Sequence, residues 1–363
     1  MKRLMIFAMA ATVLASCSKD TTVDLLPTEE NQIYASIDNE ESRVQLQDLH
    51  TVWTAGDRIV VHSPSDLTVW QFNGKTGDRK GSFSRVGYYN VDASSMSRFD
   101  KYYAMYSYNN YFNFGSVGST PAILMEAPAT QTYLKDSYGL HANTMFGTSN
   151  DGVNYTFKNL HGYLRLSLTG DQVVSKIELN GNNSEFIAGV FYLKIDNPEQ
   201  IYWQQSETST ITLDCGSGVA LSDTPTNFYF VVPPITFTNG ISVNIHFSNG
   251  EIYPKSTSKP ITITRNTIQP MKTISTSGGV QWKNIYIYHT GSEIVVPKLP
   301  NGVPSVTTVN WGDGNTTLLG DIARRYYYTD GVESHVISIK TTETNLFEMD
   351  SCEGITKIDL SNF

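Results

Sequence analysis

The chain has 363 residues, a formal net charge of −9 at pH 7, and 17% charged residues. This length is sufficient for two or three domains. The acidic balance and the lack of a basic patch argue against a nucleic-acid partner. Charged residues are fewer than the roughly 25% of an average domain. Ser, Thr, Asn, Gly and Tyr take their place, which suits an extracellular β protein.

The first 17 residues have the features of an export signal. Lys2 and Arg3 precede an apolar run at 4–13, which is too short to span a bilayer as a helix. The following residues, Leu-Ala-Ser-Cys at 14–17, make the segment resemble a bacterial lipoprotein signal. That resemblance implies a signal peptide at 1–16 and a lipidated Cys17 at the mature N-terminus. The alternative is an ordinary signal peptide with a chance cysteine.

Residues 17–32 are polar, show no strong periodicity, and are expected to form a tether. Lys19-Asp20 loosely resembles the charged signal that accompanies export of lipoproteins to the surface of Gram-negative anaerobes. We therefore expect a protein anchored in the cell outer membrane through the lipid on Cys17 and exposed at the cell surface.

The remaining chain has a β pattern nearly throughout. Short alternating or β-branched runs are separated by Asn-Gly and Asp-Gly pairs, which tolerate the positive φ angles of tight hairpin turns. The clearest predicted hairpin is 241–250, with Ile241, Val243, Ile245 and Phe247 on one face. No segment has sustained helical periodicity, so an all-β fold is predicted.

Two composition changes divide this β region. A turn-rich stretch at 149–152 and a Ser/Gly-rich stretch at 275–279 are the expected boundaries. The predicted domains are an N-terminal β-sandwich at 33–152, a second β-sandwich at 153–275, and a smaller C-terminal β domain at 280–363.

The order of motifs from 33 to about 271 resembles the fimbrillin family, the subunits of lipoprotein-derived pili. That resemblance implies two tandem transthyretin-like β-sandwiches and a role in fimbriae or a related surface structure. The motifs that carry it are IYASI at 33–37, VWTAGDRI at 52–59, YYAMY at 102–106, FKNL at 157–160 with YLRL at 163–166, KIELNG at 176–181, and FYFVVPP at 228–234.

The same motifs also have structural interpretations. Trp53 and Ile59 are predicted core residues, and Gly56-Asp57 is a predicted turn. Pro233-Pro234 is expected to end a strand, because proline cannot donate to a sheet ladder. We therefore expect these motifs to mark fold and not chemistry.

The last eighty-odd residues have a different pattern. The segment VNWGDG at 309–314, the tyrosines at 326–328, and the run SHVISI at 334–339 resemble a PKD-type immunoglobulin-like domain. That resemblance implies an immunoglobulin-like β fold for 280–363. Alternating apolar residues at 355–363 predict a final strand.

No catalytic, metal or cofactor motif is found, although that absence does not exclude an enzyme. The resemblance to fimbrillins implies a non-enzymatic protein. Cys215 and Cys352 are expected to be buried, unpaired thiols, with a disulfide as the alternative. His161 and His246 are expected to be structural residues with satisfied hydrogen bonds. A surface hydrolase would require two convergent carboxylates, which spacing alone cannot identify.

An aromatic run at 101–114 is the best candidate binding surface, because Tyr side chains give rigid contact area with a polar tip. Tyr103 and Tyr106 are expected in the core. Tyr108, Tyr111 and Phe112 are candidates for contact with a glycan or another subunit, with burial as the alternative.

The leading hypothesis is a non-enzymatic accessory, tip or anchor subunit of a pilus. The resemblance implies partners among other pilus subunits, joined by strand exchange after proteolysis at an arginine. Arg43 occupies that place, although it could equally be an ordinary loop arginine. The alternative is a glycan-binding surface lipoprotein of a polysaccharide-uptake system, with host or dietary glycans as ligands.

Overall fold

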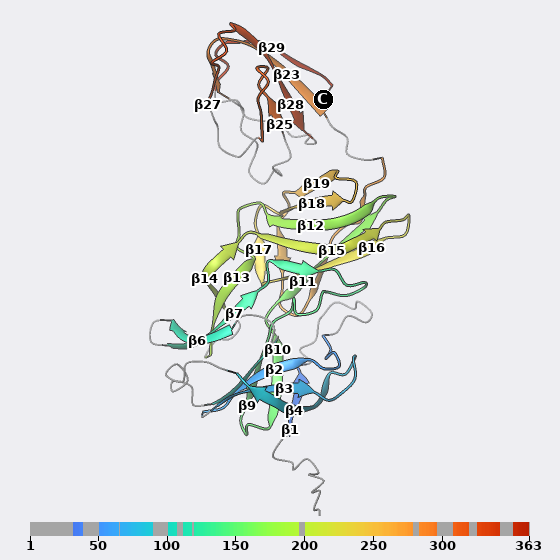
Figure 1. Ribbon diagram of the computed structural model, residues 1–363, viewed down its shortest axis with the longest axis vertical. Coiled ribbons are helices and arrows are strands. Elements are labelled where there is room, and N and C mark those ends of the chain that lie inside the picture. Colours follow the sequence, from blue (N-terminus) through green and yellow to red (C-terminus); the bar gives the residue numbers. More distant parts are fainter. Residues whose placement is uncertain are drawn as a thin grey trace, which may run out of the picture.

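The computed structural model describes residues 32–38, 51–64, 66–89, 101–106, 112–117, 120–195, 200–278, 283–295, 308–318, 325–341 and 351–362. The regular structure in these ranges is β-strand, which confirms the all-β class. Within them, no helix has the length and apolar character that crossing a membrane requires. Figure 1 shows the strands grouped in three tiers along the long axis of the molecule.

The lowest tier in Figure 1 is a sheet that closes on itself. Its closure depends on the first strand, which pairs in parallel with β10 on one side and antiparallel with β4 on the other. The barrel order is β1 (Gln32–Ile37), β10 (Asn154–Asn159), β9 (Met145–Ser149), β5 (Tyr102–Tyr106), β2 (Arg58–His62), β3 (Leu67–Phe72) and β4 (Lys80–Tyr88), which returns to β1.

Both faces of the strands β2, β5 and β9 are buried. Ile59 and Val61 point into the barrel core, while Val60 between them packs outside it. Ala104 and Met105 on β5 divide in the same way. Successive side chains of a strand point to opposite faces, so burial on both sides requires the continuous apolar runs seen here.

The outer barrel face packs against a four-stranded sheet. This sheet contains Ile123 and Met125 from β7 together with Phe191 and Leu193 from β13, and they share one core with Val60 and Met105. Residues 112–127 therefore pair with residues 188–208, across the boundary expected near 152. The sheet order is β14 (Ile201–Thr208), β13 (Ala188–Lys194), β7 (Thr120–Ala127) and β6 (Phe112–Val117).

Two further sheets in the middle tier enclose the largest core cluster, as in a β-sandwich. One has the order β19 (Ile252–Thr257), β18 (Ile241–Phe247), β12 (Val173–Gly181), β15 (Thr210–Ala220) and β8 (Thr130–Thr132). The other has the order β16 (Thr226–Val232), β11 (Gly162–Thr169) and β21 (Ile268–Pro270), with β22 (Ile274–Ser275) also on β11. A short pair, β17 (Ile235–Phe237) and β20 (Ile261–Ile263), adds to the same core.

The C-terminal tier has its own core, formed by Ile285, Ile287, Trp311, Ile337 and their neighbours. Its main sheet has the order β26 (Thr316–Leu318), β25 (Thr308–Asn310), β28 (Ser334–Thr341), β23 (Lys283–Thr290) and β29 (Ile355–Asn362). A second, two-stranded sheet joins β24 (Glu293–Val295) to β27 (Arg325–Tyr327).

Several local predictions are confirmed. Trp53 and Ile59 are fully buried, and Gly56 has a φ of 83° in the predicted turn. The strand β16 ends at Val232, directly before Pro233. The predicted hairpin is formed by β18 and β19, and its four predicted inward-facing side chains are all buried.

Candidate functional site

The first candidate feature is the strand β1 with its two lines of backbone pairing, one to β10 and one to β4. These two lines of pairing are called the seams of β1. Its alternation places Ile33, Ala35 and Ile37 in the barrel core, where each is 3–4% exposed. Tyr34 lies on the opposite face and is 50% exposed. The strand is thus held by backbone pairing on both sides and by three apolar side chains beneath it.

Trp53 is the centre of the core below β1. Its ring lies 5.1–5.9 Å, centroid to centroid, from the rings of Phe72, Phe83, Tyr106 and Phe157. Three of these contacts are edge-to-face, the arrangement that the aromatic quadrupole favours. The barrel interior is therefore filled by aromatic side chains.

A buried carboxylate stabilises the turn that leads into β2. Asp57 accepts hydrogen bonds from the Thr54 amide at 2.7 Å and from the Tyr106 hydroxyl at 3.3 Å. Burial raises the pKa of Asp57, although both hydrogen bonds oppose that shift. These contacts give the carboxylate a structural role in the turn.

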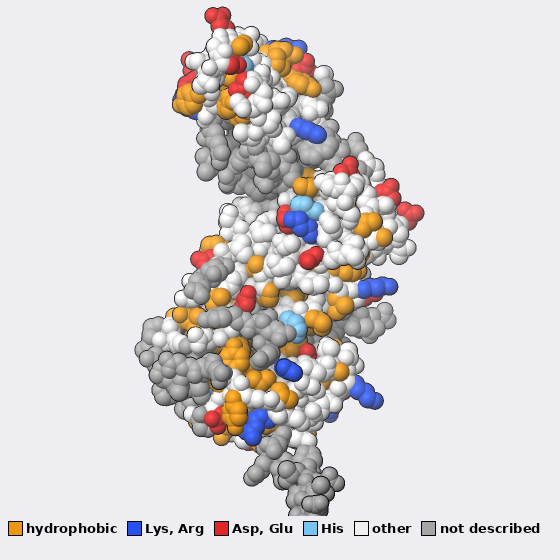
Figure 2. Space-filling model, viewed as in Figure 1, with side chains coloured by type: hydrophobic (Ala, Val, Ile, Leu, Met, Phe, Trp, Pro, Cys, Tyr) orange, Lys and Arg blue, Asp and Glu red, His pale blue; other side chains and the backbone are white. Residues whose placement is uncertain are grey.

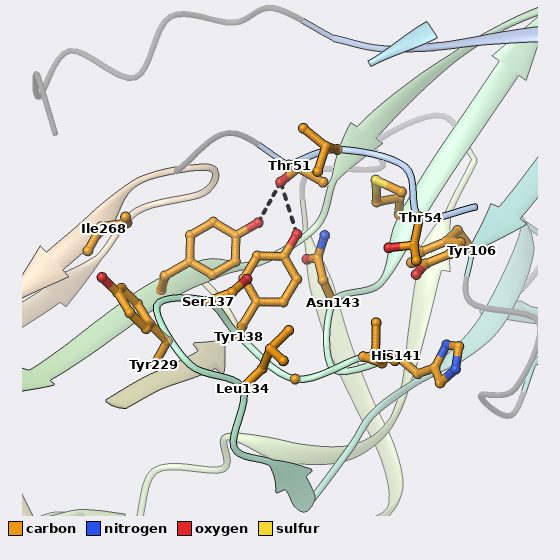
Figure 3. A pocket seen from close by; sticks show the side chains of 15 residues that line it. Thr51, Thr54, Tyr106, Leu134, Ser137, Tyr138, His141, Asn143, Tyr229 and Ile268 are labelled. Atoms are coloured by element: carbon orange, nitrogen blue, oxygen red, sulfur yellow. Dashed lines mark hydrogen bonds between the residues drawn. The ribbon is translucent and has the colours of Figure 1, made fainter. Parts of the chain in front are cut away.

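The second candidate feature is a polar cluster between the barrel and the middle tier (Figure 3). The Thr51 hydroxyl is its centre, with the Tyr163 hydroxyl at 2.9 Å and the Tyr138 hydroxyl at 3.4 Å. The same Thr51 oxygen accepts from Asn159 Nδ2 at 2.8 Å. Asn143 Nδ2 in turn donates to Asn159 Oδ1 at 2.7 Å. The cluster therefore joins residues distant in sequence.

A small cavity, here called the junction pocket, opens beside this cluster. It has a volume of about 80 Å³. Burial raises the pKa of Tyr138 and Tyr163, so both hydroxyls stay neutral. The described residues that line it are Thr51, Val52, Thr54, Tyr106, Leu134, Ser137, Tyr138, Gly139, Leu140, His141, Asn143, Met145, Tyr163, Tyr229 and Ile268.

The site residues predicted from sequence do not gather in one place. Cys17, Arg43, Tyr108 and Tyr111 lie outside the described residues. Phe112 is described, is 4% exposed, and packs in the core between the barrel and the four-stranded sheet. The structure therefore places Phe112 in a core and not on a binding surface.

Sequence reasoning missed the junction pocket. Tyr138 and Asn143 belong to no motif, and Tyr163 was noted only as part of a strand. These side chains meet because the loop at 134–143 folds over β11, where Tyr138 stacks on Tyr163 at 4.9 Å with an interplanar angle of 8°. The one available signal was the unusual abundance of tyrosine, which does not identify positions.

The C-terminal tier contains a compact aromatic and histidine cluster. Tyr328 stacks on His335 at 3.5 Å, and His335 Nε2 lies 2.9 Å from Asp330 Oδ2. His289 faces His335 across the β23–β28 pair. Burial, and secondarily the charge of His335, lowers the pKa of His289.

The predicted WGDG segment forms the turn between β25 and β26. Trp311 is buried and stacks on Tyr326 at 4.0 Å. The Tyr326 hydroxyl donates to Asp313 Oδ2 at 2.6 Å, and this hydrogen bond is the main cause that lowers the pKa of Asp313. The segment thus connects the turn to the core.

Two histidine predictions and two cysteine predictions have mixed outcomes. His246 is structural, with its Nε2 3.0 Å from Glu178 Oε2. His161 is fully buried, but neither ring nitrogen has a hydrogen-bond partner among the described residues, so the expected satisfaction is wrong. Cys215 and Cys352 are both unpaired as expected. Cys215 is buried, whereas Cys352 is exposed, which corrects the prediction for that residue.

The described surface has mixed character. In the view of Figure 2, hydrophobic side chains are interspersed with acidic and basic ones over all three tiers. Among the described residues, no group of three or more His, Cys, Asp or Glu side chains could hold a metal ion.

Comparisons with known proteins found similar solved structures only. No family model matches the chain. No curated protein matches it. A proposed cell adhesion protein from Bacteroides ovatus aligns with a TM-score of 0.40 and 15% identity, covering 68% of this chain and 91% of that chain.

Two fimbrial proteins align at lower scores. A fimbrial protein from Bacteroides ovatus has a TM-score of 0.26 and 10% identity, over 71% of this chain and 52% of that chain. The fimbrial anchor protein Mfa2 from Porphyromonas gingivalis has a TM-score of 0.26 and 10% identity, over 62% of this chain and 81% of that chain. Since these scores are below 0.5, the functional argument rests on this chain's own residues.

Proposed function

We propose that this chain is a non-enzymatic surface lipoprotein that serves as an accessory, tip or anchor subunit of a pilus or a related adhesive structure. In this proposal, a lipidated Cys17 holds the uncleaved protein in the outer membrane, and loss of β1 after cleavage transfers the remaining chain to its partner subunit. Several acyl chains on one cysteine bind a membrane far more durably than a single chain. Other subunits are the partners, joined through exchange of a β-strand.

The observation that carries the proposal is the position of β1 in the barrel. Its register runs from Tyr34 opposite Asn154 on β10, and from Gln32 opposite Ser84 on β4. Loss of β1 would leave backbone donors and acceptors unpaired along both neighbours. It would also uncover the core positions now filled by Ile33, Ala35 and Ile37.

An opened barrel of this kind is suited to capture a strand from another chain. Unpaired strand edges are templates for pairing, and each buried backbone group left without a partner costs about 1–3 kcal/mol. An incoming strand with apolar residues at alternate positions would restore both seams and the core. This mode of recognition is β-augmentation.

Arg43 supplies the proposed cleavage point, because it lies between β1 and the next described segment at 51–64. Cleavage there would separate β1 from the remaining chain without breaking any strand of the barrel. The strand would then be held only by its noncovalent contacts. A strand from another chain could then replace β1, because no covalent link would hold β1 in the barrel.

Treatment of the purified protein with an arginine-specific protease tests the proposal. We expect ladders of oligomers from the wild type and none from Arg43→Ala. Arg85→Ala, at an exposed position on β4, is the matched control and should still form ladders. Clean cleavage at Arg43 with a product that stays monomeric would contradict assembly by strand exchange.

A reversible disulfide between β1 and β4 tests directly whether β1 must be displaced. Tyr34 lies directly opposite Ser82 in the antiparallel register, so Tyr34→Cys with Ser82→Cys allows a disulfide across that seam. We expect the oxidised double variant to be cleaved without forming ladders, and to form them once reductant is added. Ladders from the oxidised form would show that displacement of β1 is not required.

Glycan binding by a surface lipoprotein is the alternative function. Of the aromatic residues first considered for it, Phe112 is buried. The observation that favours this alternative is the junction pocket, whose lining combines aromatic rings with neutral polar groups.

A further inference from the structure

The walls of the junction pocket are aromatic and aliphatic. Tyr138 and Tyr163 are stacked, and Tyr229 also lines the pocket. Leu134 and Leu140 also line the pocket and are 43% and 58% exposed. Aromatic side chains of this kind offer an apolar face and a polar tip. Such walls suit a ligand that has both C–H faces and hydroxyl groups.

One buried acceptor in the pocket lacks a partner. Asn143 is 1% exposed, and its Nδ2 donates to Asn159 Oδ1. Its Oδ1 has no hydrogen-bond partner among the described residues. Figure 3 shows this side chain beside the Tyr138 ring, within the pocket lining. This oxygen is closed to solvent in the structure, so a ligand hydroxyl reaches it only after a small rotation of the side chain, and the hydrogen bond then made would remove the cost of a buried acceptor without a partner.

The side chains that line the pocket disfavour a charged ligand. The described residues that line the pocket include one histidine, His141, and no Asp, Glu, Lys or Arg. The raised pKa values of Tyr138 and Tyr163 keep both hydroxyls protonated. A charged ligand would lose its hydration there without an Asp, Glu, Lys or Arg side chain in the lining to pair with, which is unfavourable. The preferred ligand is therefore neutral.

The size of the pocket limits the ligand to one small unit. Its volume of about 80 Å³ is several times the ~10–15 Å³ that one water needs by this measure. It is well below the roughly 300–1,000 Å³ of pockets that enclose drug-sized molecules. A single ring at the end of a longer molecule fits this limit, with the rest of the molecule outside.

From these four features we infer that the junction pocket binds one neutral terminal sugar ring of a glycan. The ring packs on the tyrosine and leucine walls, and its hydroxyls bond to Asn143 Oδ1 and the tyrosine hydroxyls. This inference deepens the alternative function, since it names the ligand class and its site. It does not depend on strand exchange.

Saturation-transfer NMR of the full-length protein with a panel of methyl glycosides tests the inference. The panel holds the neutral glycosides of glucose, galactose, mannose, fucose and N-acetylglucosamine, and the anionic glycoside of N-acetylneuraminic acid. We expect at least one neutral glycoside to bind with a dissociation constant on the order of 1 mM, as is usual for so small a ligand. The anionic glycoside should bind at least tenfold more weakly.

Leu140→Trp narrows the pocket mouth at an exposed position, and we expect it to weaken glycoside binding at least tenfold. The matched control is Leu360→Trp on β29, where the leucine is 46% exposed and distant from the pocket. It should bind as the wild type does. Unchanged thermal unfolding of both variants would show that the fold is retained.

Two results would overturn the inference: no neutral glycoside binds, or Leu140→Trp and Leu360→Trp bind equally well. The ladder assay separates this outcome from the proposed function, because Leu140→Trp should still assemble after cleavage at Arg43. Sugar binding without ladders would reject strand exchange and leave the pocket assignment intact.

Discussion

In the N-terminal barrel every strand has a paired neighbour on both sides, whereas the main C-terminal sheet ends on β26 and β29. On β29, Ile358 and Leu360 are 44% and 46% exposed, while the apolar residues of β1 are almost fully buried. An exposed edge is permanently available for pairing. The barrel strands β4 and β10 can pair with another chain only after β1 leaves. The edge strands of the C-terminal sheet need no such step, so only in the barrel can pairing be controlled.

The cores of the two regions differ as well. The barrel is filled by aromatic rings around Trp53, and the C-terminal core includes two buried histidines beside Tyr328. Apolar packing is insensitive to pH, whereas the burial that lowers the pKa of His289 makes folding stability depend on protonation. The comparison therefore predicts an apolar barrel core with little dependence on pH, and a C-terminal core whose dependence through His289 is smaller than that of His161, which lies between β10 and β11.

The largest expected effect is from Trp53→Ala, which should destabilise the barrel by about 3–5 kcal/mol because it leaves a cavity inside the aromatic core. Trp311→Ala should cost less, since its stacking partner Tyr326 is only partly buried. Urea unfolding followed by region-resolved hydrogen exchange measures both. Trp53→Phe is the control and should lose much less. A greater loss from Trp311→Ala would reverse the comparison.

Acidification is expected to have the next largest effect, through His161. Burial lowers the pKa of His161 to about 3, compared with about 6.5 in an unfolded chain. As the pH falls below 6.5, the unfolded state binds the proton first. Stability is therefore complete above pH 6.5 and declines toward pH 3, by about 3 kcal/mol at pH 4.

His161→Leu should remove this acid dependence, as measured by urea unfolding at pH 7 and pH 4. His289→Leu is the C-terminal comparison and should remove a smaller part, because backbone hydrogen bonds of Glu293 and Glu353 oppose the effect of burial on the pKa of His289. If His161→Leu retains the full loss of stability between the two pH values, the acid response arises elsewhere.

A smaller effect is expected from Thr51→Val, which keeps the side-chain shape but removes the oxygen shared by Tyr163 and Asn159. The loss should be about 1–2 kcal/mol, because buried partners are left unsatisfied. Thr356→Val is the matched C-terminal change, since the Thr356 hydroxyl donates to the Tyr288 carbonyl at an exposed position. It should cost less than half as much in the same unfolding assay. Equal losses would show that burial does not distinguish the two hydroxyls.

The smallest expected effect is from Glu293→Gln, which breaks the ion pair with Arg325 in the C-terminal tier. The two side chains are 42% and 57% exposed, so water screens the pair. The change in unfolding free energy should be about 0–1 kcal/mol and should disappear at high salt. A larger, salt-independent loss would indicate that this pair is structurally required.

Local chemistry made part of this fold predictable. The alternation of Ile241, Val243, Ile245 and Phe247 predicted a strand with one buried face, and the Asn-Gly pair after it predicted the turn. Trp53 was predicted as a core residue and is fully buried. These features depend on neighbours in the sequence, so the sequence alone contains them.

Closure of the barrel and the junction pocket were not predictable in the same way. The parallel pairing of Tyr34 with Asn154 joins segments more than a hundred residues apart, and no periodicity specifies such a partner. The contact between Thr51 and Tyr163 spans a similar separation. For Phe112 the sequence left both binding and burial open, because an aromatic run does not indicate which face of a strand is covered, and the structure shows burial.

The two seams of β1 have a mechanical consequence. If the chain is held to a membrane at Cys17, a pulling force enters the barrel at Gln32 and acts along the axis of β1. The hydrogen bonds to β4 and β10 lie across that axis, so they share the load together instead of breaking one at a time. Cleavage at Arg43 would then leave this shear-loaded strand as the barrel's remaining attachment to its anchor.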